Sequence, residues 1–341
     1  MSPGAAQPNA AQRIGAQRRL AVVIGVIALA LLSMAAALSL GSRTLSPAHL
    51  FDILASRGDA LERDVVLLLR LPRASAAFAC GALLALAGTL LQVLLRNPLA
   101  DPFLLGVSGG AAVGALGALL LGLAAAAPLF ALGGACVASA FVLAFAFSGG
   151  WNTYRVLLAG VAFSSGFGAL VGLMLTLAPA AQVQGMLFWL LGDLSGAGSG
   201  NAAAWAVLAV TGAIALTQAG ALNVLALGDD KARSLGVPVT AIQLSLFVVA
   251  AGATVAAVLI GGSIGFIGLL VPHLLRLTGV HDHRLLLPLG ALLGGALLTL
   301  ADTVARSAAA PVELPVGVVT ALIGVPALIA LLARPGSGGR R

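Results

Sequence analysis

The sequence has little charge: aspartate, glutamate, lysine and arginine make up 9% of its 341 residues. Soluble globular proteins carry about 25% of such residues, so this chain has too few to cover a water-soluble surface. Apolar residues make up 60% of the sequence instead. The composition therefore argues against a soluble domain and indicates a protein that spans a membrane several times.

Lysine is nearly absent, and its single example, Lys231, does not lie in a glycine-rich loop. The pattern G-x-x-x-x-G-K-[ST], which binds nucleotide phosphates, is missing, as is H-E-x-x-H. We therefore expect that the chain is not an enzyme and binds no cofactor. If ATP drives it, a separate subunit must hydrolyse the ATP. The net charge of +7 is interpreted as a signal of membrane orientation rather than of nucleic-acid binding.

Cysteine is also scarce, since Cys80 and Cys136 are the only two and both lie in apolar runs. They predict neither a disulfide framework nor a zinc site. His281 and His283 are separated by a single residue and would need further ligands nearby to hold a metal. We interpret them as part of a short polar turn and predict no metal site.

Long apolar runs are what the sequence has in abundance. A helix needs roughly 20 apolar residues to cross a bilayer. The first run is longer than the ~7–15 apolar residues of a signal peptide, and we interpret it as a retained span. We predict an all-α polytopic membrane protein with about ten spans, some of them broken. Their ranges are 20–40, 74–95, 103–122, 128–147, 156–177, 203–221, 239–259, 263–278, 285–305 and 316–333. The run 263–278 allows a short span, a broken helix or a re-entrant segment.

The connections between these runs predict the orientation. Twelve arginine or lysine residues fall on the side of the two termini and six on the other side, which places both termini in the cytoplasm. Residues 1–19 and 334–341 are then cytoplasmic tails, and residues 20–333 form the transmembrane domain. The outer loop 41–73 carries both signs of charge and is expected to be structured.

Ionisable residues inside the predicted spans are few. Asp302 and Arg306 have the i, i+4 spacing of a pair on one helix face, and we interpret them mainly as a structural pair. This scarcity disfavours the alternative of a stand-alone secondary transporter of a small solute, which would need buried proton- or ion-binding groups. The 44 glycines predict close helix packing, because small residues let helices approach in lipid.

Several motifs follow one another in a specific order. They are "RLPR" (70–73), "NPLADPFLLGVSGGA" (97–111), "RVLLAGVA" (155–162), "FWLLGDLSG" (188–196), "LNVLALGDDKARSLGV" (222–237), "GFIGLLVPHLLRL" (265–277), "DHRLLLP" (282–288), "ADTVAR" (301–306) and "ELPVGVVTALIGVP" (313–326). Their order and spacing resemble the FecCD family of ABC-importer permeases over about residues 20–333. The resemblance implies a type II ABC importer permease fold in the bacterial inner membrane.

The resemblance also implies partners and cargo. The chain would form a homodimer, bind two cytoplasmic ATPase subunits that hold ATP and Mg, and receive substrate from a periplasmic binding protein. Family substrates are iron chelates (siderophores or haem) and cobalamin, and we expect an iron chelate first.

The motifs imply roles for particular residues. The cytoplasmic gate would contain Asn97, Leu99, Asn152 and Thr153. The segment 222–237 would couple to the ATPase through Leu225, Gly228, Asp229, Asp230, Lys231, Arg233 and Gly236. The binding protein would dock on Arg70, Arg73 and Arg306.

Plainer interpretations remain open beside these roles. The gate residues fit an ordinary turn in which Asn97 and Asp101 accept hydrogen bonds at helix starts. The coupling segment fits a solvated loop, and Arg306 fits a structural partner of Asp302.

Overall fold

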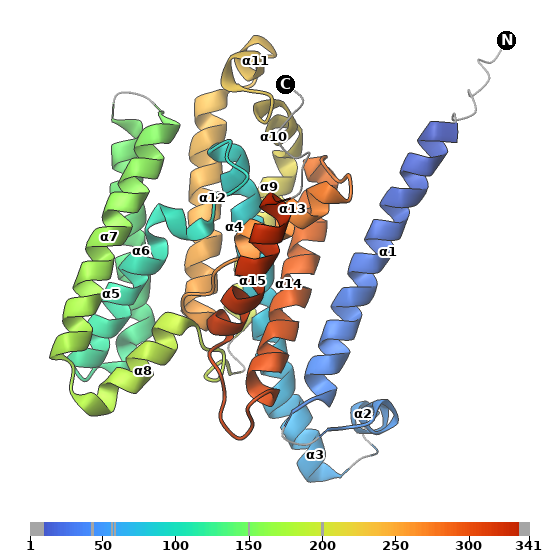
Figure 1. Ribbon diagram of the computed structural model, residues 1–341, viewed down its shortest axis with the longest axis vertical. Coiled ribbons are helices and arrows are strands. Elements are labelled where there is room, and N and C mark those ends of the chain that lie inside the picture. Colours follow the sequence, from blue (N-terminus) through green and yellow to red (C-terminus); the bar gives the residue numbers. More distant parts are fainter. Residues whose placement is uncertain are drawn as a thin grey trace.

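The computed structural model describes residues 10–41, 44–55, 57, 59–148, 151–198 and 201–333 (Figure 1). These residues form helices and turns, and no β-strand occurs among them. The helices are α1 (Ala10–Ser39), α2 (Pro47–Leu54), α3 (Ala60–Asp64), η1 (Val65–Arg70), α4 (Leu71–Leu94), η2 (Pro102–Leu105), α5 (Val107–Leu120), η3 (Ala124–Ala126), α6 (Ala127–Phe147), α7 (Thr153–Leu177), α8 (Ala180–Leu191), α9 (Ala202–Thr217), α10 (Ala219–Leu225), α11 (Asp229–Ser234), α12 (Val239–Gly261), α13 (Ile267–Leu277), α14 (His283–Ser307) and α15 (Val316–Leu332). The prediction of an all-α protein is confirmed.

Six helical stretches of the described chain are long and apolar enough to cross a membrane. They are Gln17–Ser39, Ala60–Leu94, Ala124–Phe147, Thr153–Leu177, Val239–Gly261 and His283–Ser307. A seventh results if α9 and α10, which meet at a bend of 60°, form one broken span. The remaining predicted spans contain the shorter helices α5, α13 and α15. With 11 residues, α13 is about 16 Å long, roughly half the hydrocarbon thickness.

Helix bounds differ from the predicted ranges at two places. The span predicted at 74–95 belongs to a longer helical stretch, in which α3, the π-helix η1 and α4 run continuously from Ala60 to Leu94. The prediction 263–278 also starts too early, because the backbone breaks between α12 and α13. Gly262 and Phe266 have φ of +68° and +70°, a left-handed conformation that no α-helix contains. The run thus contains an irregular segment followed by one short helix, α13.

Helix α4 is the centre of the bundle and packs on α12, α13 and α14. Glycines make these contacts close. A Cβ atom built on Gly88 would lie 1.9 Å from the carbonyl oxygen of Gly268 in α13, and one on Gly81 would lie 2.2 Å from the carbonyl oxygen of Gly294 in α14. The expectation of small-residue packing is confirmed, since no larger side chain fits at these points.

The bundle has two ends, which we name from Figure 1. The upper face holds the start of α1, the end of α4, the hairpin of α10 and α11, and the start of α14. The lower face holds the end of α1, the short helices α2 and α3, and the end of α14. Helices α5, α6 and α7 form a group beside α12, and α1 lies on the far side against α14 (Figure 1).

Candidate functional site

The predicted coupling segment, residues 222–237, forms a helical hairpin of α10 and α11 on the upper face (Figure 1). Left-handed glycines bound α11, since Gly228 has φ +114° and Gly236 has φ +79°. Asp230, Lys231 and Arg233 are exposed on it. The charged residues of the segment therefore form a compact surface helix rather than an extended loop.

The apolar residues of this hairpin point in two directions. Leu222 and Leu225 are buried beneath it, whereas Leu227 and Leu235 are 60% and 62% exposed. The expectation that Leu225 presents itself to a partner is therefore not supported, because that side chain packs inside the chain. Leu227 was missed, since the spacing of leucines alone does not tell which one faces outward.

Polar contacts tie the hairpin to the rest of the upper face. Asp229 pairs with Arg96 and accepts a hydrogen bond from Nε2 of Gln243 at 3.3 Å. Asn223 donates from Nδ2 to the carboxylate of Asp282 at 2.8 Å and accepts from the backbone N–H of His283 at 3.0 Å. The hydrogen bond from Asn223 is the main cause that lowers the pKa of Asp282. The hairpin is thus attached at two points, one toward α4 and α12 and one toward α14.

Between these two attachments lies a cavity of about 690 Å³. Its wall comes from the end of α4, from the hairpin and from the turn before α14. The lining residues are Gln92, Val93, Arg96, Pro98, Asn223, Ala226, Leu227, Arg276, His281, Asp282 and His283. The hairpin and the end of α4 therefore both line this cavity, while α10 also packs on α4.

The two predicted gate turns are built by their own asparagines. The Asn97 side chain accepts a hydrogen bond from the N–H of Leu99 at 2.9 Å. The Asn152 side chain caps α7 by accepting from the N–H of Tyr154 at 2.9 Å and of Arg155 at 3.3 Å. Leu99 is exposed, and Thr153 is the first residue of α7. Among the contacts of the described residues, no hydrogen bond or ion pair joins the two turns.

Asp101 links the first turn to the broken helix. Its carboxylate accepts a hydrogen bond from the N–H of Phe103 at 2.9 Å and another from the backbone of Phe266. These are the starts of η2 and of α13, whose first N–H groups lack partners within the helix. The expected capping is confirmed for Asp101, which caps η2, whereas Asn97 holds a turn that no helix follows directly. The second contact of Asp101 was not foreseen.

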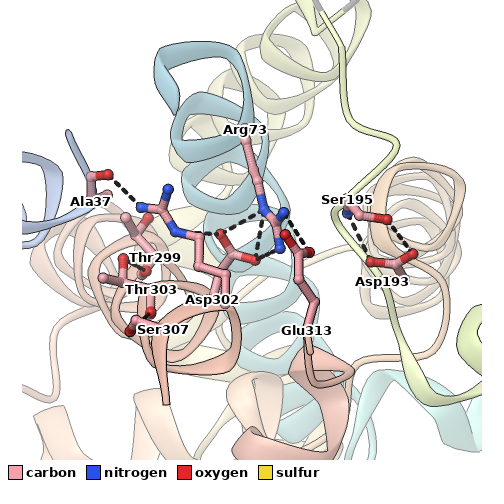
Figure 2. Close-up of polar contacts among 10 residues, drawn as sticks. Ala37, Arg73, Asp193, Ser195, Thr299, Asp302, Thr303, Ser307 and Glu313 are labelled. Carbon is pink, nitrogen blue, oxygen red and sulfur yellow. Dashed lines mark hydrogen bonds and ion pairs between the residues drawn. The ribbon is translucent and has the colours of Figure 1, made fainter. Parts of the chain in front are cut away.

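The three predicted docking arginines lie at the lower face, and Figure 2 shows Arg73 with Asp302 and Glu313. Arg73 holds both oxygens of Asp302, with distances of 2.9 Å from Nη2 and 3.1 Å from Nε, and binds Glu313 through Nη1 at 2.8 Å. The Asp302–Arg306 pair expected from the i, i+4 spacing is present but longer, at 3.9 Å. Arg73 is therefore the main partner of Asp302.

The other two arginines of this cluster hold the end of α1. Arg306 donates to the carbonyl of Ala37 (Figure 2), and Arg70 donates to the carbonyls of Leu38 at 2.8 Å and Ser39 at 3.1 Å. All three arginines thus have intramolecular partners in this structure. Glu313, whose side chain is 43% exposed, is the most accessible member of the network that includes Arg73, Asp302 and Arg306.

No group of three or more histidine, cysteine, aspartate or glutamate side chains in the described ranges is arranged to hold a metal ion. His281 and Asp282 lie in the turn before α14, whose first residue is His283, and Asp282 caps that helix by accepting from the N–H of Arg284 at 3.0 Å.

Comparison with known proteins agrees with this architecture. The FecCD transport family matches residues 28–334. The vitamin B12 import system permease BtuC of Salmonella typhi is 39% identical over 324 residues, which cover 93% of this chain and 96% of BtuC. The uncharacterized ABC transporter permease YvrB of Bacillus subtilis is 36% identical over 291 residues, which cover 83% of this chain and 82% of YvrB.

Two solved structures share the fold. A metal-chelate type ABC transporter in an inward-facing conformation superposes with a TM-score of 0.81 at 30% identity, covering 91% of this chain and 98% of that one. PsaBC from Streptococcus pneumoniae, solved with an antibody fragment, has a TM-score of 0.58 at 17% identity and covers 80% of this chain and 95% of its own. The predicted type II ABC importer permease fold is confirmed.

Because the family match spans nearly the whole chain and the relatives are transport permeases, this membrane protein belongs to the FecCD transport family and is an ABC importer permease.

Proposed function

We propose that the chain is the membrane subunit of a binding-protein-dependent importer in the bacterial inner membrane, driven by ATP hydrolysis on two separate cytoplasmic subunits. The observation that carries this proposal is the exposed hairpin of α10 and α11. The chain belongs to a transport family and its sequence has no nucleotide-binding loop, so a separate ATPase would have to bind such a surface. The upper face is then cytoplasmic, in agreement with the distribution of basic residues.

A second copy of the chain completes the pathway in this proposal. Helix α15 exposes Leu322, Ile323 and Ile329, each 60% exposed or more. Beside it, an apolar groove of about 490 Å³ is lined by residues of α8 and α15. A homodimer that joins these faces would enclose a largely apolar passage, which suits a bulky cargo that is handed over rather than tightly bound. The turns at Asn97–Leu99 and Asn152–Thr153 would close it on the cytoplasmic side.

The proposed cargo is a bulky metal chelate. The relatives include vitamin B12 permeases, and the structural neighbour is of metal-chelate type, so cobalamin and an iron chelate (siderophore or haem) are the two candidates. Reconstitution distinguishes them. The chain, its cognate ATPase and its binding protein are placed in proteoliposomes, and uptake of each compound is measured with and without ATP. We expect ATP-dependent uptake of one of them. Uptake by the chain alone, driven by a proton or sodium gradient, would contradict the proposal.

The exposed leucines of the hairpin are expected to hold the ATPase. Replacing Leu227 or Leu235 by Asp should weaken association with the ATPase by about 30-fold, the effect of losing an interface residue worth ~2 kcal/mol. Affinity of the purified subunits measures this. Leu61→Asp, an exposed position in α3 on the opposite face, is the matched control. Equal affinity of the Leu227 and Leu235 variants and wild type would refute the coupling surface.

The arginine cluster makes a specific prediction for docking of the binding protein. An acidic group of that protein can pair with Arg73 only by replacing Glu313, which occupies Nη1 at 2.8 Å. Glu313→Gln should therefore tighten association at low salt by about two- to fivefold, the effect of an exposed ion pair of ~0.5–1 kcal/mol.

The charge-matched control is Asp52→Asn, an exposed position of α2 on the same face. It separates a local effect at Arg73 from a general change in surface charge. Unchanged or weaker binding of the Glu313 variant would count against docking at Arg73.

A further inference from the structure

Arg96 has a backbone conformation that is unusual for its residue type. It ends α4 with φ +47°, the left-handed position that glycine normally occupies after a helix. The N–H of Arg96 bonds the carbonyl of Val93 at 3.2 Å, and that of Asn97 bonds the carbonyl of Gln92 at 3.2 Å. These two bonds define a Schellman motif. A glycine would serve this turn with less strain, so the arginine side chain needs another explanation.

The side chain of Arg96 reaches the hairpin. It pairs with Asp229, the first residue of α11. The Asp229 carboxylate is also held by Nε2 of Gln243 in α12, and Gln243 is only 1% exposed. Asp229 thus joins three elements: the turn that begins at Asn97, the surface hairpin and a long buried helix.

This ion pair lies beside the cavity of about 690 Å³, which is lined by Arg96, Pro98 and Leu227. The other polar attachment, from Asn223 to Asp282 and His283, leads to α14 and away from the gate turn. Among the described contacts, the ion pair between Arg96 and Asp229 is the polar connection from the hairpin to residue 97.

We propose that the Arg96–Asp229 ion pair transmits movement of the hairpin to the gate turn at Asn97–Leu99. The proposal rests on the proposed function, in which the ATPase binds this hairpin. When the ATPase displaces α11, Asp229 moves with it and draws Arg96, whose neighbour Asn97 begins the gate turn. Arg96 and Asp229 are positioning residues in this scheme, and neither contacts the cargo.

The test separates the side chain from the backbone. Arg96→Gly removes the guanidinium but suits the left-handed conformation, so the turn should still form. Asp229→Asn removes the charge from the other partner. In the reconstituted system we expect Arg96→Gly to bind the ATPase and to hydrolyse ATP as wild type does. Transport per ATP hydrolysed should fall by about fivefold or more in both variants, as for coupling between sites of ~1 kcal/mol. Arg57→Gly, an exposed non-helical arginine on the lower face, is the control and should transport normally.

The exchanged pair, Arg96→Asp with Asp229→Arg, is the decisive variant. Aspartate tolerates a left-handed backbone, and the unpaired buried Oε1 of Gln243 can accept from an arginine at 229. We expect this variant to restore most of the lost transport per ATP. Normal transport by Arg96→Gly, loss of its ATPase binding, or failure of the exchange to restore coupling would each overturn the proposal. Absence of ATP-driven uptake by the wild-type system would instead reject the proposed function.

Discussion

Replacing Gly88 by alanine is expected to abolish the folded protein. The added Cβ would lie 1.9 Å from the carbonyl oxygen of Gly268 and 2.4 Å from its carbonyl carbon. Both are backbone atoms that no rotamer change can move. Overpacking usually costs about 1–3 kcal/mol, and this backbone clash in the central helix should exceed that range. The yield of monodisperse protein in detergent and its thermal stability measure the effect.

Gly25→Ala provides the matched control for this substitution. Gly25 also lies inside a long apolar helix, α1, but a Cβ atom added there would meet nothing within 4 Å. Because alanine favours helix over glycine by about 1 kcal/mol, this variant should be as stable as wild type or more so. A Gly88→Ala protein with wild-type thermal stability would show that α4 and α13 do not pack as closely as described.

The second large effect is expected at Asp302. Its carboxylate is 2% exposed and lies between Arg73 and Arg306, which are 12% and 8% exposed (Figure 2). Asp302→Asn would leave two buried guanidinium groups without their shared counter-charge. Removing one partner of a buried ion pair costs about 3–5 kcal/mol. We therefore expect a large fall in the thermal stability of the purified protein.

Two further variants test this explanation. Glu313→Gln removes a more exposed partner of Arg73 and should cost about 1 kcal/mol or less. Arg73→Gln combined with Asp302→Asn removes the positive charge that the single variant leaves behind, and should recover part of the stability. If Asp302→Asn unfolds like wild type, the cluster does not stabilise the lower face.

The composition and the apolar runs predicted the class of the protein and the approximate positions of the long helices. Local rules also predicted that Asp101 caps a helix, because a side chain two residues before a backbone N–H can reach it whatever the fold. Both features depend on short segments, within which the sequence itself determines geometry. The family was predicted by the order of several motifs along most of the chain.

Contacts between distant segments were not predictable in the same way. In lipid, both the buried and the outer face of a helix are apolar, so hydrophobic periodicity does not show which face is inside. For this reason the close approach of Gly88 and Gly268 emerged only from the structure. The pairing of Arg73 with Asp302 joins residues 229 positions apart. The i, i+4 spacing within one helix indicates only Arg306 as a partner of Asp302.

Asp101 has a consequence for how the bundle can change shape. One carboxylate serves the starts of two separate helices, at Phe103 and at Phe266. If either helix shifted alone, its first N–H would lose an acceptor in a region with little water to replace it. The Asp101 carboxylate therefore links the two helix starts, and we expect a movement of the loop that follows α4 to displace the start of α13 as well.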